Sequence, residues 1–137
     1  MNANRLKALP LFRDLAHRDL ERIARWTDEV DVKPGRHLVE QGAFPHEFMV
    51  IESGTASVLI DGNLIAELGP GDFFGEMALL EHQRRSATVT ATTDLRVVVM
   101  HDRDFRAMED VLPEVARSIR ATMDERRKNA IPADEDG

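Results

Sequence analysis

The sequence predicts an α+β domain in which helices at both ends flank an antiparallel β-sandwich or barrel. Apolar residues follow a helical spacing up to Trp26, alternate or form short runs from Thr27 to Met100, and return to helical spacing after Asp102. About seven or eight short strands fit between the turns of the middle part, which is typical of antiparallel sandwiches and barrels. Asp61-Gly62, between two apolar runs, is the strongest hairpin signal in the chain.

Two short helices are predicted before the sheet. Apolar positions from Leu6 to Ala24 recur at helical spacing, and Pro10 interrupts them. The second helix is expected from about Ala16 to Trp26.

The predicted strands follow in order along the middle of the chain. Val30 and Val32 alternate before Lys33-Pro34-Gly35, which has proline and glycine in the order of a type II turn. The later apolar segments predict strands over residues 37–41, 47–52, 55–60, 64–68, 86–93 and 95–100.

Two helices are predicted after the sheet. Asp102 is expected to be the N-cap of the first, and Pro113 followed by Glu114 is expected to begin the second. The domain is predicted to span residues 1–130, and residues 131–137, with one proline and an acidic run, are predicted to form a disordered tail.

The second C-terminal helix carries a narrow apolar stripe. Val115, Ile119 and Met123 recur at every fourth position, and the chain beyond them is polar. We expect this stripe to be too thin for a core helix, so the helix is predicted to open easily and to act as a lid.

Composition excludes several classes of protein. The 137 residues contain no cysteine, which excludes disulfides and cysteine-bound metals, and they carry a net charge of −7, which argues against a sequence-independent grip on nucleic acid. No apolar run approaches the ~18 residues of a membrane span, and the beginning of the chain lacks a secretory signal, so a cytoplasmic location is expected.

The segment from Gly69 to Ala87 holds the residues that indicate a ligand. A glycine-rich turn precedes a very short predicted helix, whose first N–H groups have no partner within the helix and can bind an anion. Gly75 leaves room for the ligand, and Arg85 is a fixed charge suited to phosphate oxygens. Glu76 would repel the anion unless it accepts hydrogen bonds from hydroxyls of the same ligand, a combination that describes a nucleotide.

These residues resemble a known family. Residues 74–80 (FGEMALL) followed by residues 85–89 (RSATV) are similar to the phosphate-binding cassette of cyclic nucleotide-binding domains. Residues 9–12, 35–42, 48–54 and 68–72 fall in the order and spacing of that family, so the resemblance covers roughly residues 5–128. It implies a β-roll, a jelly-roll-like barrel with a short cassette helix.

The resemblance also implies roles for single residues. Arg85 would bind the phosphate, Glu76 would accept the ribose 2′-hydroxyl, and Ser86 would add a hydroxyl to the phosphate or base. Gly75, Met77 and Ala78 would contribute mainly backbone groups. Arg85→Ala is expected to weaken binding without a change in fold stability, because a ligand-free site is expected to gain nothing from the arginine.

The base pocket is the less specific part of this assignment. Val58 and Ala66 match positions that line the base pocket in relatives, with plain core packing as the alternative. Arg126 matches an arginine that covers the base, with Arg127, or a solvated residue that compensates the helix dipole, as alternatives. Arg84 stands where many relatives have proline, which makes the segment before Arg85 less rigid.

The predicted ligand is cyclic AMP rather than cyclic GMP, because relatives that prefer the guanine nucleotide commonly have threonine where this chain has Ser86. No cofactor is predicted. The predicted partners are the cyclic nucleotide and an unknown effector protein or parent polypeptide, without nucleic acid and without a membrane span, because the chain leaves no room for a helix-turn-helix and has no membrane helix.

Two alternatives remain open. A domain of this fold could serve another ligand or a protein–protein contact, although Glu76 and Arg85 argue against it. A cupin-like metal enzyme would share the β architecture, but the five histidines are scattered without the paired spacing that such enzymes use, so the chain is predicted not to be an enzyme.

Overall fold

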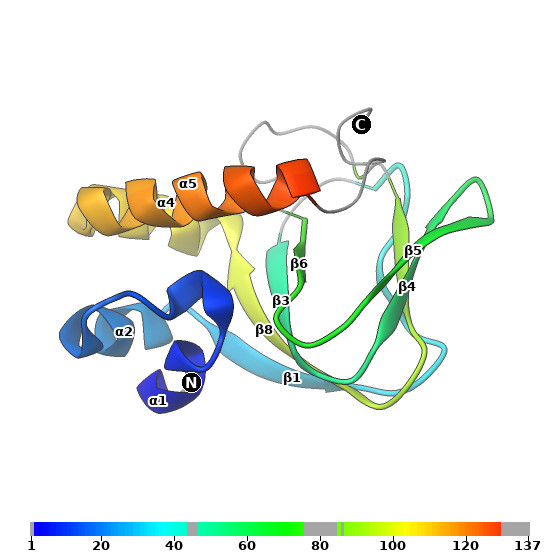
Figure 1. Ribbon diagram of the computed structural model, residues 1–137, viewed down its shortest axis with the longest axis horizontal. Helices are drawn as coiled ribbons and strands as arrows, with labels where there is room; N and C mark the ends of the chain where they lie inside the picture. The colour runs from blue at the N-terminus through cyan, green and yellow to red at the C-terminus, as the bar shows by residue number, and fades with distance from the viewer. Residues whose placement is uncertain (1, 44–46, 76–84, 86, 130–137) are drawn as a thin grey trace.

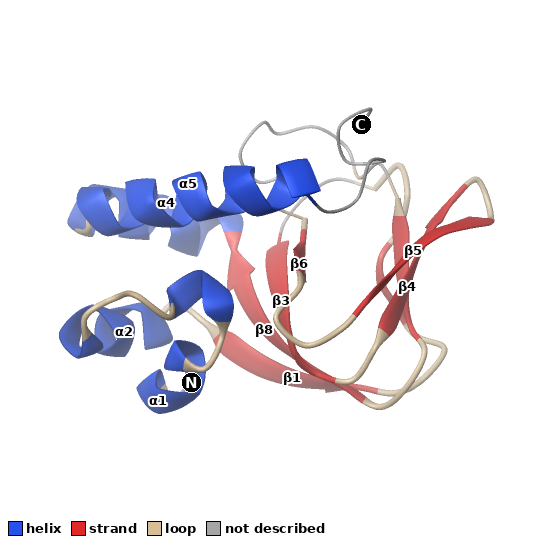
Figure 2. Ribbon diagram, in the orientation of Figure 1, coloured by secondary structure: helices blue, strands red, loops and turns tan. Residues whose placement is uncertain are grey.

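The computed structural model describes residues 2–43, 47–75, 85 and 87–129. Figure 1 shows the helices of both chain ends on one side of two facing sheets, and Figure 2 separates the helical part from the strands by colour. No helix within the described ranges has both the length and the hydropathy to cross a membrane.

Each sheet has four antiparallel strands, in the orders β1-β8-β3-β6 and β2-β7-β4-β5. The strands are β1 (Asp28–Val32), β2 (His37–Val39), β3 (Glu47–Ser53), β4 (Ala56–Ile60), β5 (Asn63–Leu68), β6 (Phe73–Phe74), β7 (Thr88–Ala91) and β8 (Leu95–His101). The predicted α+β class and antiparallel β-roll are therefore confirmed, although the two sheets do not close into a barrel over the described residues. The predicted cassette helix after Gly75 lies outside those residues.

Strands β3 and β8 form the centre of the fold because both of their faces are buried. Phe48, Val50, Val98 and Met100 pack against the helices, whereas Met49, Ile51, Val97 and Val99 pack against the second sheet. Burial of one such side chain contributes about 1.5–3 kcal/mol. Burial on both faces explains why the middle of each strand, residues 48–51 and 97–100, is a continuous apolar run.

The two predicted turns have the expected geometry. Asp61 and Gly62 both have positive φ, 51° and 81°, as a two-residue type I′ hairpin loop requires. Gly35 has a φ of 89°, and the Arg36 N–H donates to the Lys33 carbonyl at 3.3 Å, which closes the turn between β1 and β2.

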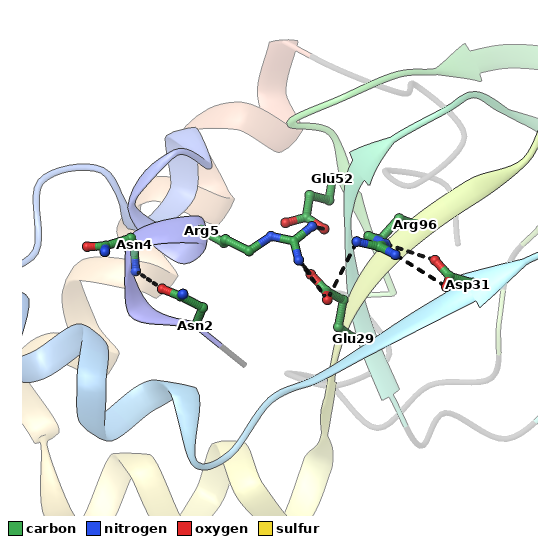
Figure 3. A network of polar contacts seen from close by, with 7 residues as sticks. All are labelled: Asn2, Asn4, Arg5, Glu29, Asp31, Glu52 and Arg96. Atoms are coloured by element: carbon green, nitrogen blue, oxygen red, sulfur yellow. Dashed lines mark hydrogen bonds and ion pairs between the residues drawn. The ribbon is translucent and has the colours of Figure 1, made fainter.

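The N-terminal helices are α1 (Ala3–Lys7), the 3-10 helix η1 (Pro10–Phe12) and α2 (His17–Ala24). A helix as short as α1 is not stable alone, so contacts with the rest of the fold must hold it. Leu6 is fully buried in the helix-side core. Arg5 donates from Nη1 to Glu29 Oε1 at 3.0 Å and from Nη2 to Glu52 Oε1 at 2.8 Å, and these contacts tie α1 to β1 and β3 (Figure 3).

The carboxylates around Arg5 form a wider ionic cluster. Arg96 on β8 pairs with Asp31 at 2.8 Å and lies 3.8 Å from Glu29, so two arginines join the acidic residues on the helix-facing side of the first sheet (Figure 3). Burial and the adjacent Glu29 carboxylate raise the pKa of Glu52. The hydrogen bond from Arg96 lowers the pKa of Asp31.

The C-terminal helices are α4 (Asp102–Val111) and α5 (Pro113–Asn129). Pro113 begins α5 as predicted. The N-cap prediction for α4 is wrong by one residue, because His101 holds the extended cap conformation and Asp102 is already helical.

The prediction that α5 is too thinly apolar to join the core is also wrong for its first half. Ala116 and Ile119 are 3% and 2% exposed and belong to the helix-side core. Ala116 is not one of the large apolar residues of the stripe, but its small side chain lets the helix approach its neighbours closely. Arg120 adds a contact between helices, since its Nη2 donates to Glu109 Oε2 at 2.5 Å and its guanidinium lies over the Phe105 ring.

Candidate functional site

Gly75 and Arg85, ten residues apart in the chain, meet at the end of β6. The Arg85 side chain is buried, with 7% of the residue exposed. Its Nη1 donates to the Gly75 carbonyl at 3.1 Å, and its Nη2 donates to the Glu47 carbonyl at the start of β3. The arginine therefore joins the ends of two neighbouring strands, β3 and β6.

Only glycine fits at position 75. Its φ of 89° is a conformation that other residues rarely adopt. A Cβ atom there would also lie 2.7 Å from the Glu47 carbonyl oxygen and directly against Arg85 Nη1. A larger residue would therefore displace the guanidinium group from its two carbonyl acceptors.

The backbone of Arg85 is fixed as firmly as its side chain. The Arg85 N–H donates to the Ala43 carbonyl at 2.9 Å, and the Gly42 N–H donates to the Arg85 carbonyl at 2.8 Å. Both ends of the residue are thus held by the segments around β2 and β3. A cavity of about 260 Å³ opens beside the residue, with Glu40, Ala43 and Glu47 in its wall.

The Arg85 guanidinium is a buried cation whose hydrogen-bond acceptors include two carbonyl groups. Burial of a charge is costly unless the charge is solvated by polar groups, and here two neutral carbonyl oxygens partly replace water. An anionic oxygen would make a shorter and stronger hydrogen bond with the same guanidinium than a neutral carbonyl does. The site is therefore chemically suited to a phosphate or carboxylate group.

The predicted base-pocket residues lie directly opposite each other. Val58 on β4 pairs with Ala66 on β5 and, on its other side, with Val89 on β7. Val58 is 1% exposed and belongs to the core between the sheets, and Ala66 packs against that core. In the structure, Val58 is thus a core residue and Ala66 is a partly buried residue at the margin of that core.

The remaining predicted site residues cannot be placed in the same way. Glu76, Met77, Ala78 and Ser86 lie outside the described residues. The backbone of Arg126 belongs to α5, but its side chain is likewise outside the part of the chain that the structure describes.

The structure adds Glu47, Gly42 and Ala43 to the surroundings of Arg85. All three contact Arg85 through backbone groups, and a pattern of side chains along the sequence does not reveal such contacts. The positive φ of Gly42, 84°, is the only feature that its residue type signals.

Comparison with known proteins assigns the family. The model of the cyclic nucleotide-binding domain matches residues 29–110, which include Gly75 and Arg85. The chain belongs to this family. The description of this family, a cyclic nucleotide-binding domain, agrees with a buried arginine beside a glycine that can accept no side chain.

Sequence relatives carry this domain within longer proteins. The chain is 36% identical over 120 residues to a cyclic nucleotide-gated potassium channel of Rhizobium etli, a match that covers 88% of this chain and 34% of the channel. It is 34% identical over 113 residues to a cAMP-dependent protein kinase regulatory subunit of Eremothecium gossypii, covering 82% of this chain and 25% of the subunit. The domain thus spans about a third or less of these relatives.

A solved structure supports the fold assignment at the level of a single domain. The N-terminal domain of a transcriptional regulator from Streptomyces coelicolor A3(2) is similar to this chain, with a TM-score of 0.76 and 28% identity. The match covers 91% of this chain and 94% of that domain.

Within the described residues of this chain, no group of three or more His, Asp or Glu residues is placed to hold a metal ion.

Proposed function

We propose that this domain is a non-catalytic sensor of cyclic AMP, which binds the nucleotide at Arg85 and signals through its last helix to a partner. The observation that carries the proposal is the buried Arg85 guanidinium, held against Gly75 at the end of β6. In this proposal the cyclic phosphate lies against Arg85 and the main chain that follows Gly75.

Neighbouring residues would recognise the rest of the nucleotide. Glu76 would accept a hydrogen bond from the ribose 2′-hydroxyl, and Ser86 would add a hydroxyl to the phosphate or base. Met77 and Ala78 would contribute backbone N–H groups. Val58 and Ala66 would contact the base only through apolar side-chain groups, since both also pack in or against the core between the sheets.

The preference for cyclic AMP over cyclic GMP rests on two supports. Ser86 follows Arg85, where relatives that prefer cyclic GMP commonly have threonine. A relative named as a cAMP-dependent kinase subunit also matches most of this chain. Neither support is a contact with the base, so a direct comparison of the two nucleotides is the informative measurement.

The proposed output is a change in the second half of α5. The first half is held by Ala116, Ile119 and the Arg120–Glu109 contact, which leaves residues 121–129 as the part able to respond to ligand. Arg126 lies in this part, where it could cover the base. The receiver would be an effector protein or the remainder of a longer polypeptide, as in relatives that are much longer than this chain.

Calorimetric titration with cyclic AMP and cyclic GMP tests the ligand. We expect one site per chain and tighter binding of cyclic AMP. Glu76→Gln should weaken cyclic AMP binding by about 1–2 kcal/mol, the difference between a hydrogen bond to a charged group and one to a neutral group. A 2′-deoxy analogue, which lacks the hydroxyl, should bind the wild type more weakly than cyclic AMP does. The same analogue should lose little further in Glu76→Gln. Heat release from neither cyclic nucleotide would refute the proposal.

A further inference from the structure

The two sheets leave a groove at their open edge, between β1 and β2. Its volume is about 460 Å³, and β3 and β8 contribute its floor. We call it the seam groove. Its apolar lining comes from both sheets and consists of Val30, Val32, Leu38, Met49, Val97 and Val99.

The exposure of Val30 is the first sign that the seam groove binds a further group. Val30 lies in the middle of β1 and is 42% exposed, whereas Val97, its cross-strand partner on β8, is 1% exposed. Val32 and Leu38 are half-buried on the same lining. Water therefore reaches an aliphatic surface in the middle of a sheet.

Unpaired strand edges are the second sign. β1 pairs with β8 alone and β2 pairs with β7 alone, so both end their sheets along this groove within the described residues. The edge of a sheet presents backbone N–H and C=O groups to which an extended segment can bind as a further strand. β1 offers five residues and an unbroken register with β8, whereas β2 has three residues and a register shift.

The charges of the seam groove are separated along its length. Asp28 and Glu47 lie at one end, beside the last residues of β8, and Lys33 and Arg36 lie at the other, in the turn that follows β1. Neither Asp28 nor Arg36 has a side-chain ion pair among the described residues. Lys33 and Asp94 are 3.7 Å apart and more than 80% exposed, a pair that contributes little.

The other acidic residues of β1, Glu29 and Asp31, have arginine partners. Glu29 is paired with Arg5, and Asp31 is paired with Arg96. Their charges therefore do not protect the edge in the way that unpaired edge charges do. An added strand would meet apolar side chains on the groove face and neutralised side chains on the other.

We propose that the seam groove binds an extended segment of a partner protein, which adds as a strand to β1. Every strand pair among the described residues is antiparallel, and antiparallel pairing is slightly more stable than parallel pairing. The segment would then have an acidic residue first, aliphatic residues opposite Val32 and Val30, and a basic residue opposite Asp28.

The chemistry of the groove favours this occupant over two others. A second copy of β1, in the register that sets Val30 opposite Val32, would place Asp28 opposite Pro34, so Asp28 would gain no basic partner. A fatty carboxylate could fill the apolar lining, but it would leave the β1 backbone groups without partners.

The test uses a fluorescein-labelled hexapeptide, Glu-Val-Thr-Val-Thr-Lys with an amidated end, designed to pair with residues 33 to 28 in turn. Titrated with the whole chain, its anisotropy should rise with a Kd below about 500 µM. Val30→Lys should weaken binding at least about tenfold, which corresponds to about 1.4 kcal/mol. Leu64→Lys is the matched control, because Leu64 is 60% exposed on the edge strand of the other sheet and outside the groove.

A charge exchange tests the orientation. Asp28→Lys should weaken binding of the peptide that ends in lysine. A peptide that ends in glutamate should bind this variant more tightly than it binds the wild type. Val30→Lys and Asp28→Lys should keep the melting temperature of the wild type within a few degrees, since Val30 and Asp28 are exposed.

Three results would overturn the proposal. The first is no change in anisotropy with the protein at about 1 mM. The second is an equal effect of Val30→Lys and Leu64→Lys. The third is concentration-dependent association of the chain that Val30→Lys abolishes, which would assign the groove to a second copy. None of these results depends on whether the domain binds cyclic nucleotides.

Discussion

Replacing Arg85 by alanine should reduce both nucleotide affinity and fold stability. The affinity loss follows from the removal of a charge-assisted contact with a partly enclosed phosphate, which is worth about 2–4 kcal/mol, or ~30- to 1000-fold in Kd. Arg85→Lys keeps the charge but loses the two-pronged geometry, so it should fall between the wild type and the alanine variant.

The stability loss follows from the ligand-free structure. Arg85 donates to the Gly75 and Glu47 carbonyls, and each bond of a charged donor contributes about 1.5–3 kcal/mol. Relief of the desolvated charge offsets part of this loss, so we expect a net decrease of about 1–3 kcal/mol in the free energy of unfolding. The expectation from sequence, that a ligand-free site gains nothing from Arg85, did not include these two hydrogen bonds.

Calorimetry with cyclic AMP and urea unfolding without ligand measure the two effects separately. Arg36→Ala is a suitable control, because Arg36 is exposed and has no ion pair within the described residues. Cyclic AMP affinity within threefold of the wild type would refute the phosphate assignment. An unchanged unfolding free energy would refute the structural role of the two carbonyl bonds.

Three further predictions follow from the same structure. Gly75→Ala should weaken cyclic AMP binding and should destabilise the fold more than Gly62→Ala does. Gly62 is a suitable control because its φ is similar but no atom from elsewhere in the fold lies within 4 Å of its Cβ position. An equal loss of stability in the two variants would mean that backbone strain alone acts. The raised pKa of Glu52 in the folded state means that the wild type loses stability as this carboxyl ionises, whereas a glutamine does not ionise. The unfolding free energy of Glu52→Gln should therefore rise relative to that of the wild type between about pH 4 and pH 7. Parallel curves of unfolding free energy against pH would contradict this. Truncation after Arg120 should keep the fold, since Ala116 and Ile119 remain, and should weaken cyclic AMP binding by about 1–3 kcal/mol; unchanged affinity would mean that α5 is not a lid.

The fold could be predicted because its signals are local. The change of period at Thr27 and at Asp102 marks where strands begin and end, and positive φ at Asp61 and Gly62 is what their residue types favour. The depth of α5 in the core could not be predicted in this way. Whether Ala116 is buried depends on which helix crosses it, and that is decided by tertiary packing.

In the candidate site, too, the residue pair could be predicted from the sequence, whereas its backbone partners could not. The types and spacing of Gly75 and Arg85 predicted that they act together, and their hydrogen bond agrees with that prediction. The acceptors that hold Arg85 in place are carbonyl groups of Glu47 and Gly75, and every residue has such a carbonyl. Their role depends on how β3 and β6 end beside each other, so no side-chain pattern could have identified it.

The burial of Arg85 connects folding to recognition. A free arginine side chain has about 2 kcal/mol of rotamer entropy, which is lost when the chain is fixed in one conformation. Here the Gly75 and Glu47 carbonyls fix it before any ligand is present, so the loss falls on folding and not on binding. A ligand phosphate would therefore meet a charge that is already oriented and already partly desolvated. Substitutions that loosen Arg85 without removing its charge should therefore weaken cyclic AMP binding, and displacement of Arg85 is one of the ways in which Gly75→Ala should do so.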